Sequence, residues 1–199
     1  MSGVNDIISN VYGLEPALID YIDNPCGMKM AIDHVTSIWI NLFNELNGII
    51  RSSGNTGSIT WSGVWAPGTT FPIQEDVSYM LSKEMFDTFC MPGIEALADS
   101  MDYPYYHLDG KGAVKFLDRL LGIRKLKAIQ WVSGAGNEEL SQWHDLIKHI
   151  LDGGKSAHVY ARADEVDALV KAVGSRGLLI SVNCRNMEEA NRVMDRYSP

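Results

Sequence analysis

Several features are scarce or missing in this sequence of 199 residues. No apolar run approaches the roughly 20 residues that a membrane-spanning helix needs. Residues 1–6 contain neither the basic region nor the apolar core of a signal peptide. The three cysteines, Cys26, Cys90 and Cys184, are odd in number and too widely spaced to suggest a disulfide framework. Together these features predict a cytoplasmic protein in a reducing environment, with no membrane partner.

Positive charge is also scarce. The chain has 17 Lys and Arg residues against 25 Asp and Glu residues, which gives a formal net charge of −8. An acidic chain of this kind is not expected to bind nucleic acid. Arg124, Lys125 and Lys127 form only a small basic cluster, which we interpret as a solvated turn. The hydrophobic content of 46% is typical of a globular protein with a core.

Helical patterns occupy the beginning of the chain, and we assign residues 1–55 to a helical N-terminal segment. Pro16 suits the first turn of a short helix that ends before Pro25. A longer helix follows, with apolar residues at three- and four-residue spacing. Its predicted buried face consists of Met28, Ile32, Val35, Trp39, Leu42, Phe43 and Leu46.

Alternating strands and helices occupy residues 56–199, the second predicted segment. The predicted strands are 58–61, 103–107, 127–131, 156–160 and 177–181. Such βα repeats predict an α/β fold with a parallel sheet, and both the doubly wound sheet and the barrel satisfy the pattern. A closed (β/α)₈ barrel needs eight strands and about 250 residues. The chain is therefore predicted to form an open sheet, to pair with another chain, or to represent part of a longer barrel.

The strand Tyr105-Tyr106-His107-Leu108-Asp109 carries the most informative polar residues. Residues two apart in a strand point to the same face, so His107 and Asp109 are expected to project together. The carboxyl ends of parallel strands are where α/β folds place their chemistry. The alternative is a hydrogen-bonded histidine at the strand end, with Asp109 capping the next helix.

Several motifs in this order resemble the uroporphyrinogen decarboxylase superfamily, over roughly residues 56–197. That superfamily has an acidic strand end, a "Ser-Pro-Glu-x-Phe" helix start and a "His-x-Cys-Gly" strand end. The matching segments here are Gln74-Glu75-Asp76-Val77-Ser78-Tyr79-Met80-Leu81-Ser82-Lys83-Glu84-Met85-Phe86, Met91-Pro92, His107-Leu108-Asp109-Gly110, Ile129-Gln130-Trp131-Val132-Ser133-Gly134-Ala135-Gly136 and Gly153-Gly154-Lys155. The resemblance implies a partial or truncated TIM (β/α)₈ barrel that corresponds to the later part of the superfamily's barrel.

The corrinoid-dependent methyltransferase branch of the superfamily gives our leading functional expectation. In that branch zinc activates a thiol that accepts a methyl group carried on a corrinoid protein, which would be the partner here. The resemblance implies zinc ligands at His107, at Asp109 (where the family has Cys) and at Cys184. The fourth position would stay open for the thiol, with Glu75 or Asp76 in it in the resting state. Zinc accepts all of these ligand types, although a carboxylate in place of a thiolate makes the bound thiolate less nucleophilic.

Decarboxylation of a tetrapyrrole is the second expectation. The resemblance then implies that Asp76 or Asp109 steers protonation of a pyrrole, with His107 beside them. The arginine-rich motif with which decarboxylases grip their substrate does not occur in this sequence. Trp61, Trp65 and Trp131 lie at or near strand ends and are predicted to line a broad pocket for a tetrapyrrole or corrinoid, with packing in the core and rim as the alternative.

A third expectation is a truncated, catalytically inert homologue that acts as a binding or assembly module. A parallel sheet with too few strands for a barrel leaves an edge strand and an apolar face uncovered. This hypothesis predicts a homodimer or a partner subunit that covers the open sheet. The sequence alone leaves open whether the chain is an enzyme.

Overall fold

Three helices begin the chain in the computed structural model, which describes residues 1–137 and 139–197. They are α1 (Val4–Tyr12), α2 (Leu14–Asp23) and α3 (Pro25–Ser52). The side chain of Asn24 caps α3 by accepting a hydrogen bond from the backbone N–H of Gly27 at 3.1 Å, and Pro25 suits the first helical position. The predicted long helix is confirmed.

The buried face of α3 differs in part from the predicted face. Met28, Ile32, Trp39 and Phe43 are buried as expected, together with two polar residues, Thr36 and Asn47. Leu42 and Leu46 are instead 44% and 43% exposed, because the apolar arc of this helix is wider than the surface against which it packs.

A short antiparallel hairpin follows α3, made of β1 (Ser58–Ile59) and β2 (Trp65–Ala66). The prediction that residues 58–61 form the first strand of the βα series is therefore wrong. The parallel sheet begins later, at β3 (Pro72–Ile73). The hairpin is local because Gly63, with a φ of +80°, turns the chain back within a few residues.

Five strands form the parallel sheet within the described residues, and their spatial order follows the sequence: β3, β4 (Tyr105–Asp109), β5 (Ala128–Val132), β6 (Ser156–Arg162) and β7 (Leu178–Asn183). The last four predicted strands are confirmed. A doubly wound sheet reverses its strand order at a switch point, and this sheet does not. Each successive βα unit instead adds its strand to the same edge of the sheet.

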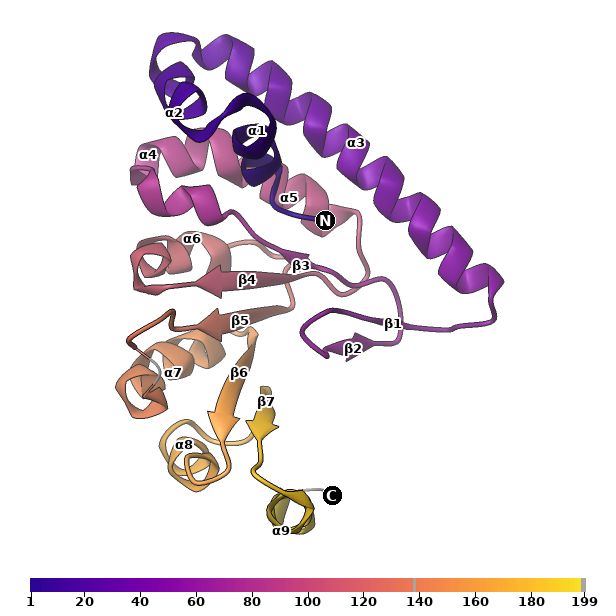
Figure 1. Cartoon of the computed structure of the whole chain (residues 1–199), viewed down its shortest axis with the longest axis vertical. Helices are drawn as coiled ribbons and strands as arrows, with labels where there is room; N and C mark the ends of the chain where they lie inside the picture. Colours follow the sequence, from indigo (N-terminus) through magenta and orange to yellow (C-terminus); the bar gives the residue numbers. More distant parts are fainter. Residues whose placement is uncertain (138, 198–199) are drawn as a thin grey trace.

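The connecting helices cover one face of the sheet. In Figure 1 the strands run from β3 to β7 down the molecule, with α6, α7 and α8 along one side. The α-helices that follow β3 in the sequence are α4 (Lys83–Met85), α5 (Met91–Asp99), α6 (Leu117–Leu121), α7 (His144–Asp152), α8 (Val166–Val173) and α9 (Met187–Tyr197), of which α9 follows the last strand. Alternate strand residues such as Leu108, Ile129 and Val159 pack against these helices in the core.

The helical run around Pro92 is irregular. A π-helical turn, Phe86–Cys90, separates α4 from α5 and comes directly before the turn that contains Pro92. Proline lacks the N–H that a regular helix needs at this point, and a π-turn accommodates the lost hydrogen bond. In the part of the chain that the structure describes, no helix is long and apolar enough to cross a membrane.

Candidate active site

The face of the sheet opposite α6, α7 and α8 carries a row of polar side chains, and we call it the open face. His107, Gln130 and His158 occupy it on β4, β5 and β6, and they are direct neighbours in the strand register. Ser181 on β7 continues the row. Because side chains alternate along a strand, the apolar neighbours of these residues point to the helices.

Hydrogen bonds join the polar row into one chain. His107 Nδ1 lies 2.6 Å from Gln130 Oε1, and Gln130 Nε2 lies 3.0 Å from His158 Nδ1. His158 Nε2 lies 2.9 Å from Ser181 Oγ. Gln130 Nε2 also donates to the hydroxyl of Tyr160 at 3.3 Å. Burial, followed by the nearby His107, lowers the pKa of His158 to about 4, so this imidazole is neutral at pH 7.

The β1–β2 hairpin lies against the open face. The hydroxyl of Tyr105 is 2.8 Å from both Thr60 Oγ1 and Ser62 Oγ. The Trp61 ring meets the His107 ring edge to face, with centroids 5.1 Å apart. Trp61 thus lies beside His107, and its side chain is 57% exposed.

Trp65 belongs to β2, whereas Trp61 lies in the turn that follows β1. Trp65 lines a pocket of ≈ 360 Å³ near the amino ends of the strands, together with Tyr105, His158 and Leu179. The hairpin therefore places its two tryptophans in different surroundings. Only Trp61 contacts the imidazole from which acid–base chemistry is expected.

The carboxyl ends of β3 and β4 bring three predicted residues together. Asp76 follows β3, and His107 and Asp109 belong to β4. Asp76 is close enough to the other two for their charges to act on it. Partial loss of water raises the pKa of Asp76, and the charges of Asp6 and Asp109 raise it further, whereas His107 lowers it. Asp76, His107 and Asp109 thus lie at the carboxyl ends of two paired strands, and we call these three residues the cluster.

Glu75 points away from this cluster, into the protein interior. Its carboxylate accepts hydrogen bonds from the backbone N–H groups of Val4 at 3.2 Å and Asn5 at 3.0 Å. Glu75 is only 2% exposed, and burial, followed by the charge of Asp6, raises its pKa well above the ordinary 4.5. This residue caps the first turn of α1, a position that suits a carboxylate.

The stability of the protein should depend on pH through Glu75. Because its pKa in the folded state is raised, its contribution to stability is complete below 4.5 and is lost as the pH rises through the folded value. We expect the melting temperature of the wild type, relative to that of Glu75→Gln, to be highest below pH 4.5 and to fall as the pH rises above it. Thermal melts of both proteins on either side of this pH check the prediction. A constant difference would contradict it.

Cys184 lies far from the cluster. It follows β7, and three strand spacings separate β7 from β4, or about 14 Å. Cys184 lines a pocket of ≈ 370 Å³ with Arg162, Arg185 and Glu189. Within residues 1–137 and 139–197, no three His, Cys, Asp or Glu side chains gather closely enough to hold a metal ion. The residues that the resemblance implies as zinc ligands do not fit a zinc ion in this arrangement.

Trp131 lies on the helix side of the sheet. Its side chain is 2% exposed and packs against Trp143, with ring centroids 4.9 Å apart. One edge lines a pocket of ≈ 290 Å³ at the carboxyl ends of β5 to β7, which also includes Tyr160, Arg162 and Glu165. Trp131 therefore lines a hollow at the carboxyl ends of β5 to β7, whereas Trp61 lies against His107 of β4.

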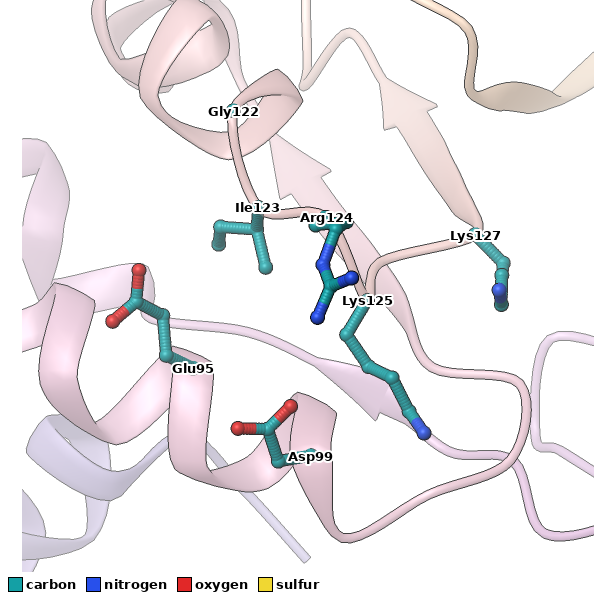
Figure 2. Close-up of a pocket in the computed structure, with 7 residues that line it drawn as sticks. All are labelled: Glu95, Asp99, Gly122, Ile123, Arg124, Lys125 and Lys127. Atoms are coloured by element: carbon teal, nitrogen blue, oxygen red, sulfur yellow. The ribbon is translucent and has the colours of Figure 1, made fainter.

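The basic cluster predicted to be a solvated turn lines a pocket of ≈ 550 Å³ at the opposite end of the strands. Figure 2 shows Glu95 and Asp99 of α5 on one side of this pocket, and Arg124 and Lys125 of the loop before β5 on the other. Two carboxylates thus offset the cations, including Lys127 at the rim. The mixed charge does not form a phosphate-binding patch.

Sequence reasoning missed Gln130, His158, Tyr160 and Ser181. Each is a polar residue inside a strand, and each points to the face that the helices leave uncovered. The sequence signal was the alternation of apolar and polar residues along the strand. Gln130 lies between Ile129 and Trp131, which are both buried against the helices. Aligning the strands in register would have placed Gln130 beside His107.

No protein-family model matches this sequence, and no curated protein does.

Proposed function

We propose that the open face at the carboxyl ends of β3 and β4 is the active site of an enzyme that transfers protons to and from a bound cyclic compound. The observation that carries this proposal is that Asp76, His107 and Asp109 come from the carboxyl ends of two paired strands, β3 and β4. The sequential parallel strands support the related proposal that the chain is part of a (β/α)₈ barrel of the uroporphyrinogen decarboxylase type.

The side chains suit acid–base chemistry. Partial burial raises the pKa of Asp76, and a carboxyl group and an imidazole are the side chains that most often transfer protons in enzymes. Within the described residues, no protein group forms a hydrogen bond with Nε2 of His107, so this atom remains available to a ligand. In tetrapyrrole decarboxylation, the reaction that these groups fit, a proton replaces the carboxylate that leaves as carbon dioxide.

The position of Trp61 favours a flat ligand. Its exposed ring packs edge to face against His107. A ligand at this position would contact both an aromatic surface and the proposed proton-transfer group. Aromatic rings that pack against a flat ligand while polar groups fix its orientation are typical of small-molecule sites.

Absorption titration of the full chain with uroporphyrin and, separately, with cobalamin tests the proposal. We expect a saturable spectral change with the porphyrin that is weaker in Trp61→Ala. The exposed Trp65 provides the matched control, because the ring that packs against His107 is that of Trp61, and Trp65→Ala should bind like the wild type. Binding of cobalamin alone, or of neither compound, would overturn the porphyrin proposal.

Corrinoid-dependent methyl transfer is the second candidate, and one observation favours it. A metal-binding histidine commonly donates its second ring N–H to a carbonyl oxygen, and His107 Nδ1 faces the amide oxygen of Gln130 in this manner. Asp109 lies two residues further along the same strand. Two of the other implied ligands, Cys184 and Glu75, lie elsewhere in the structure.

Zinc measurements separate the two candidates. Zinc-dependent methyl transfer requires about one zinc ion per chain and its loss in both His107→Ala and Cys184→Ala. The acid–base proposal expects porphyrin binding to be the same before and after treatment with a chelator. Metal analysis of the purified chain and its two variants, with porphyrin titrations alongside, provides the comparison.

We also propose that a second copy of the chain or a partner subunit covers the sheet beside β7, whether the chain is an enzyme or an inert assembly module. Leu179 on β7 and Tyr160 on β6 are 46% and 39% exposed, and within the described residues β7 pairs with β6 alone. An uncovered strand edge with apolar side chains favours association. Light scattering tests this proposal, and a stable monomer would contradict it.

A further inference from the structure

The amide group of Gln130 lies between two imidazole rings. Its oxygen is 2.6 Å from His107 Nδ1, and its nitrogen is 3.0 Å from His158 Nδ1. Gln130 is 0% exposed, so water does not compete for either contact. The three residues belong to neighbouring strands and are partners in the register, which holds the groups in place.

An amide oxygen only accepts hydrogen bonds, and an amide nitrogen only donates them. The proton of neutral His107 must therefore be on Nδ1, where it bonds to Gln130 Oε1. The opposite holds for His158, whose Nδ1 must be without a proton in order to accept from Gln130 Nε2. The two imidazoles are thus held in opposite tautomers by one side chain.

The hydrogen bonds that His158 and Gln130 make to Ser181 and Tyr160 are consistent with these tautomers. His158 with a bare Nδ1 has its proton on Nε2, which donates to Ser181 Oγ at 2.9 Å. The second N–H of the Gln130 amide donates to the Tyr160 hydroxyl at 3.3 Å. The low pKa of His158, about 4, keeps this ring neutral with a single N–H at pH 7.

We infer that Gln130 is a positioning residue that holds His107 in the Nδ1–H tautomer and so directs the lone pair of Nε2 away from the sheet's hydrogen-bond chain. Free imidazole side chains in water favour the other tautomer, with the proton on Nε2. The contact with Gln130 therefore changes which ring nitrogen can accept a proton or bind a ligand.

The use of this arrangement rests on the proposed function. When Nε2 of His107 takes a proton from a bound compound, the Nδ1–H bond to Gln130 persists in the imidazolium, and no side chain in the row has to turn. The same proton returns from Nε2 in the reverse step. Gln130 itself touches neither the ligand nor the transferred proton.

Nitrogen-15 NMR of the imidazole rings tests the inference on the full chain at pH 7.5, without any ligand. We expect His107 to show a protonated Nδ1 and a bare Nε2, and His158 to show the reverse. Two rings in the same tautomer, or the pair exchanged between the two residues, would overturn the inference. Because no ligand is added, this result does not depend on whether the porphyrin proposal holds.

Two variants of Gln130 distinguish the effect of its amide N–H donor from that of its amide oxygen acceptor. In Gln130→Glu the side chain accepts but does not donate, so His107 should keep its tautomer while His158 moves its proton to Nδ1. In Gln130→Leu both contacts are lost, and His107 should change to the Nε2–H form. Tyr160→Phe removes the third contact of the amide and is the control in which both rings stay as in the wild type.

The folded state of each variant is checked by its backbone amide spectrum. Should the leucine variant fail to fold, the glutamate variant and the wild-type assignment still decide the question. An unchanged His107 in a folded Gln130→Leu would show that another group sets its tautomer, and would overturn the role of Gln130.

Discussion

Glu75→Ala is expected to destabilise the protein by roughly 2–6 kcal/mol, because it leaves two buried donors unpaired at about 1–3 kcal/mol each. The backbone N–H groups of Val4 and Asn5 bond to this carboxylate, and both residues are 0% exposed. Domains of this size are stable by only about 5–15 kcal/mol. Urea denaturation followed by circular dichroism measures the change.

The control for this prediction is Glu95→Ala, which removes an exposed carboxylate from α5. Its unfolding free energy should remain within about 0.5 kcal/mol of the wild type. If the two variants were equally stable, the cap on α1 would contribute little. A smaller loss in Glu75→Gln than in Glu75→Ala would further support the cap, because the amide oxygen still accepts one of the two bonds.

Under the proposed function, His107→Gln is expected to reduce turnover by about 100- to 10,000-fold, the range associated with loss of a positioned acid–base group. Glutamine is similar in length but does not take up a proton at neutral pH. The measurement is the release of carbon dioxide from uroporphyrinogen, compared with binding of uroporphyrin by the same variant. We expect turnover to fall far more than affinity, since the ring of Trp61 remains in place.

His34 offers the matched control, because it is an exposed histidine on α3, away from the sheet. His34→Gln should turn over uroporphyrinogen at the wild-type rate. A His107→Gln variant with unchanged turnover would remove His107 from the mechanism and leave Asp76 and Asp109 as the only members of the cluster to test.

Much of the fold could be predicted because its signals are local. The cap Asn24 and the apolar spacing of α3 operate within a few residues, and the strands β4 to β6 have apolar residues that the helices bury. Residues 58–61 were misassigned because a hairpin strand and a sheet strand share the same local preference. Only the long-range pairing of Pro72 with Tyr105 identifies β3.

The candidate site was predictable only in part for a similar reason. His107 and Asp109 share one strand, so their proximity follows from the two-residue period. The position of Asp76 beside them depends on how β3 pairs with β4. Gln130 was predictable only as a residue of β5, because its role arises from contacts with two other strands. Glu75 was misplaced because its true partners lie about 70 residues earlier in the chain.

The sequential order of the strands also governs where the molecule opens first. Within the described residues β7 has a neighbour on one side only, none of its residues is fully buried, and α9 behind it buries only Glu189. At the other edge, both residues of β3 are buried. Local unfolding therefore begins at β7 and α9, and amide hydrogens exchange there faster than in β4 and β5. One end of the sheet can detach and re-form while the cluster around His107 stays folded.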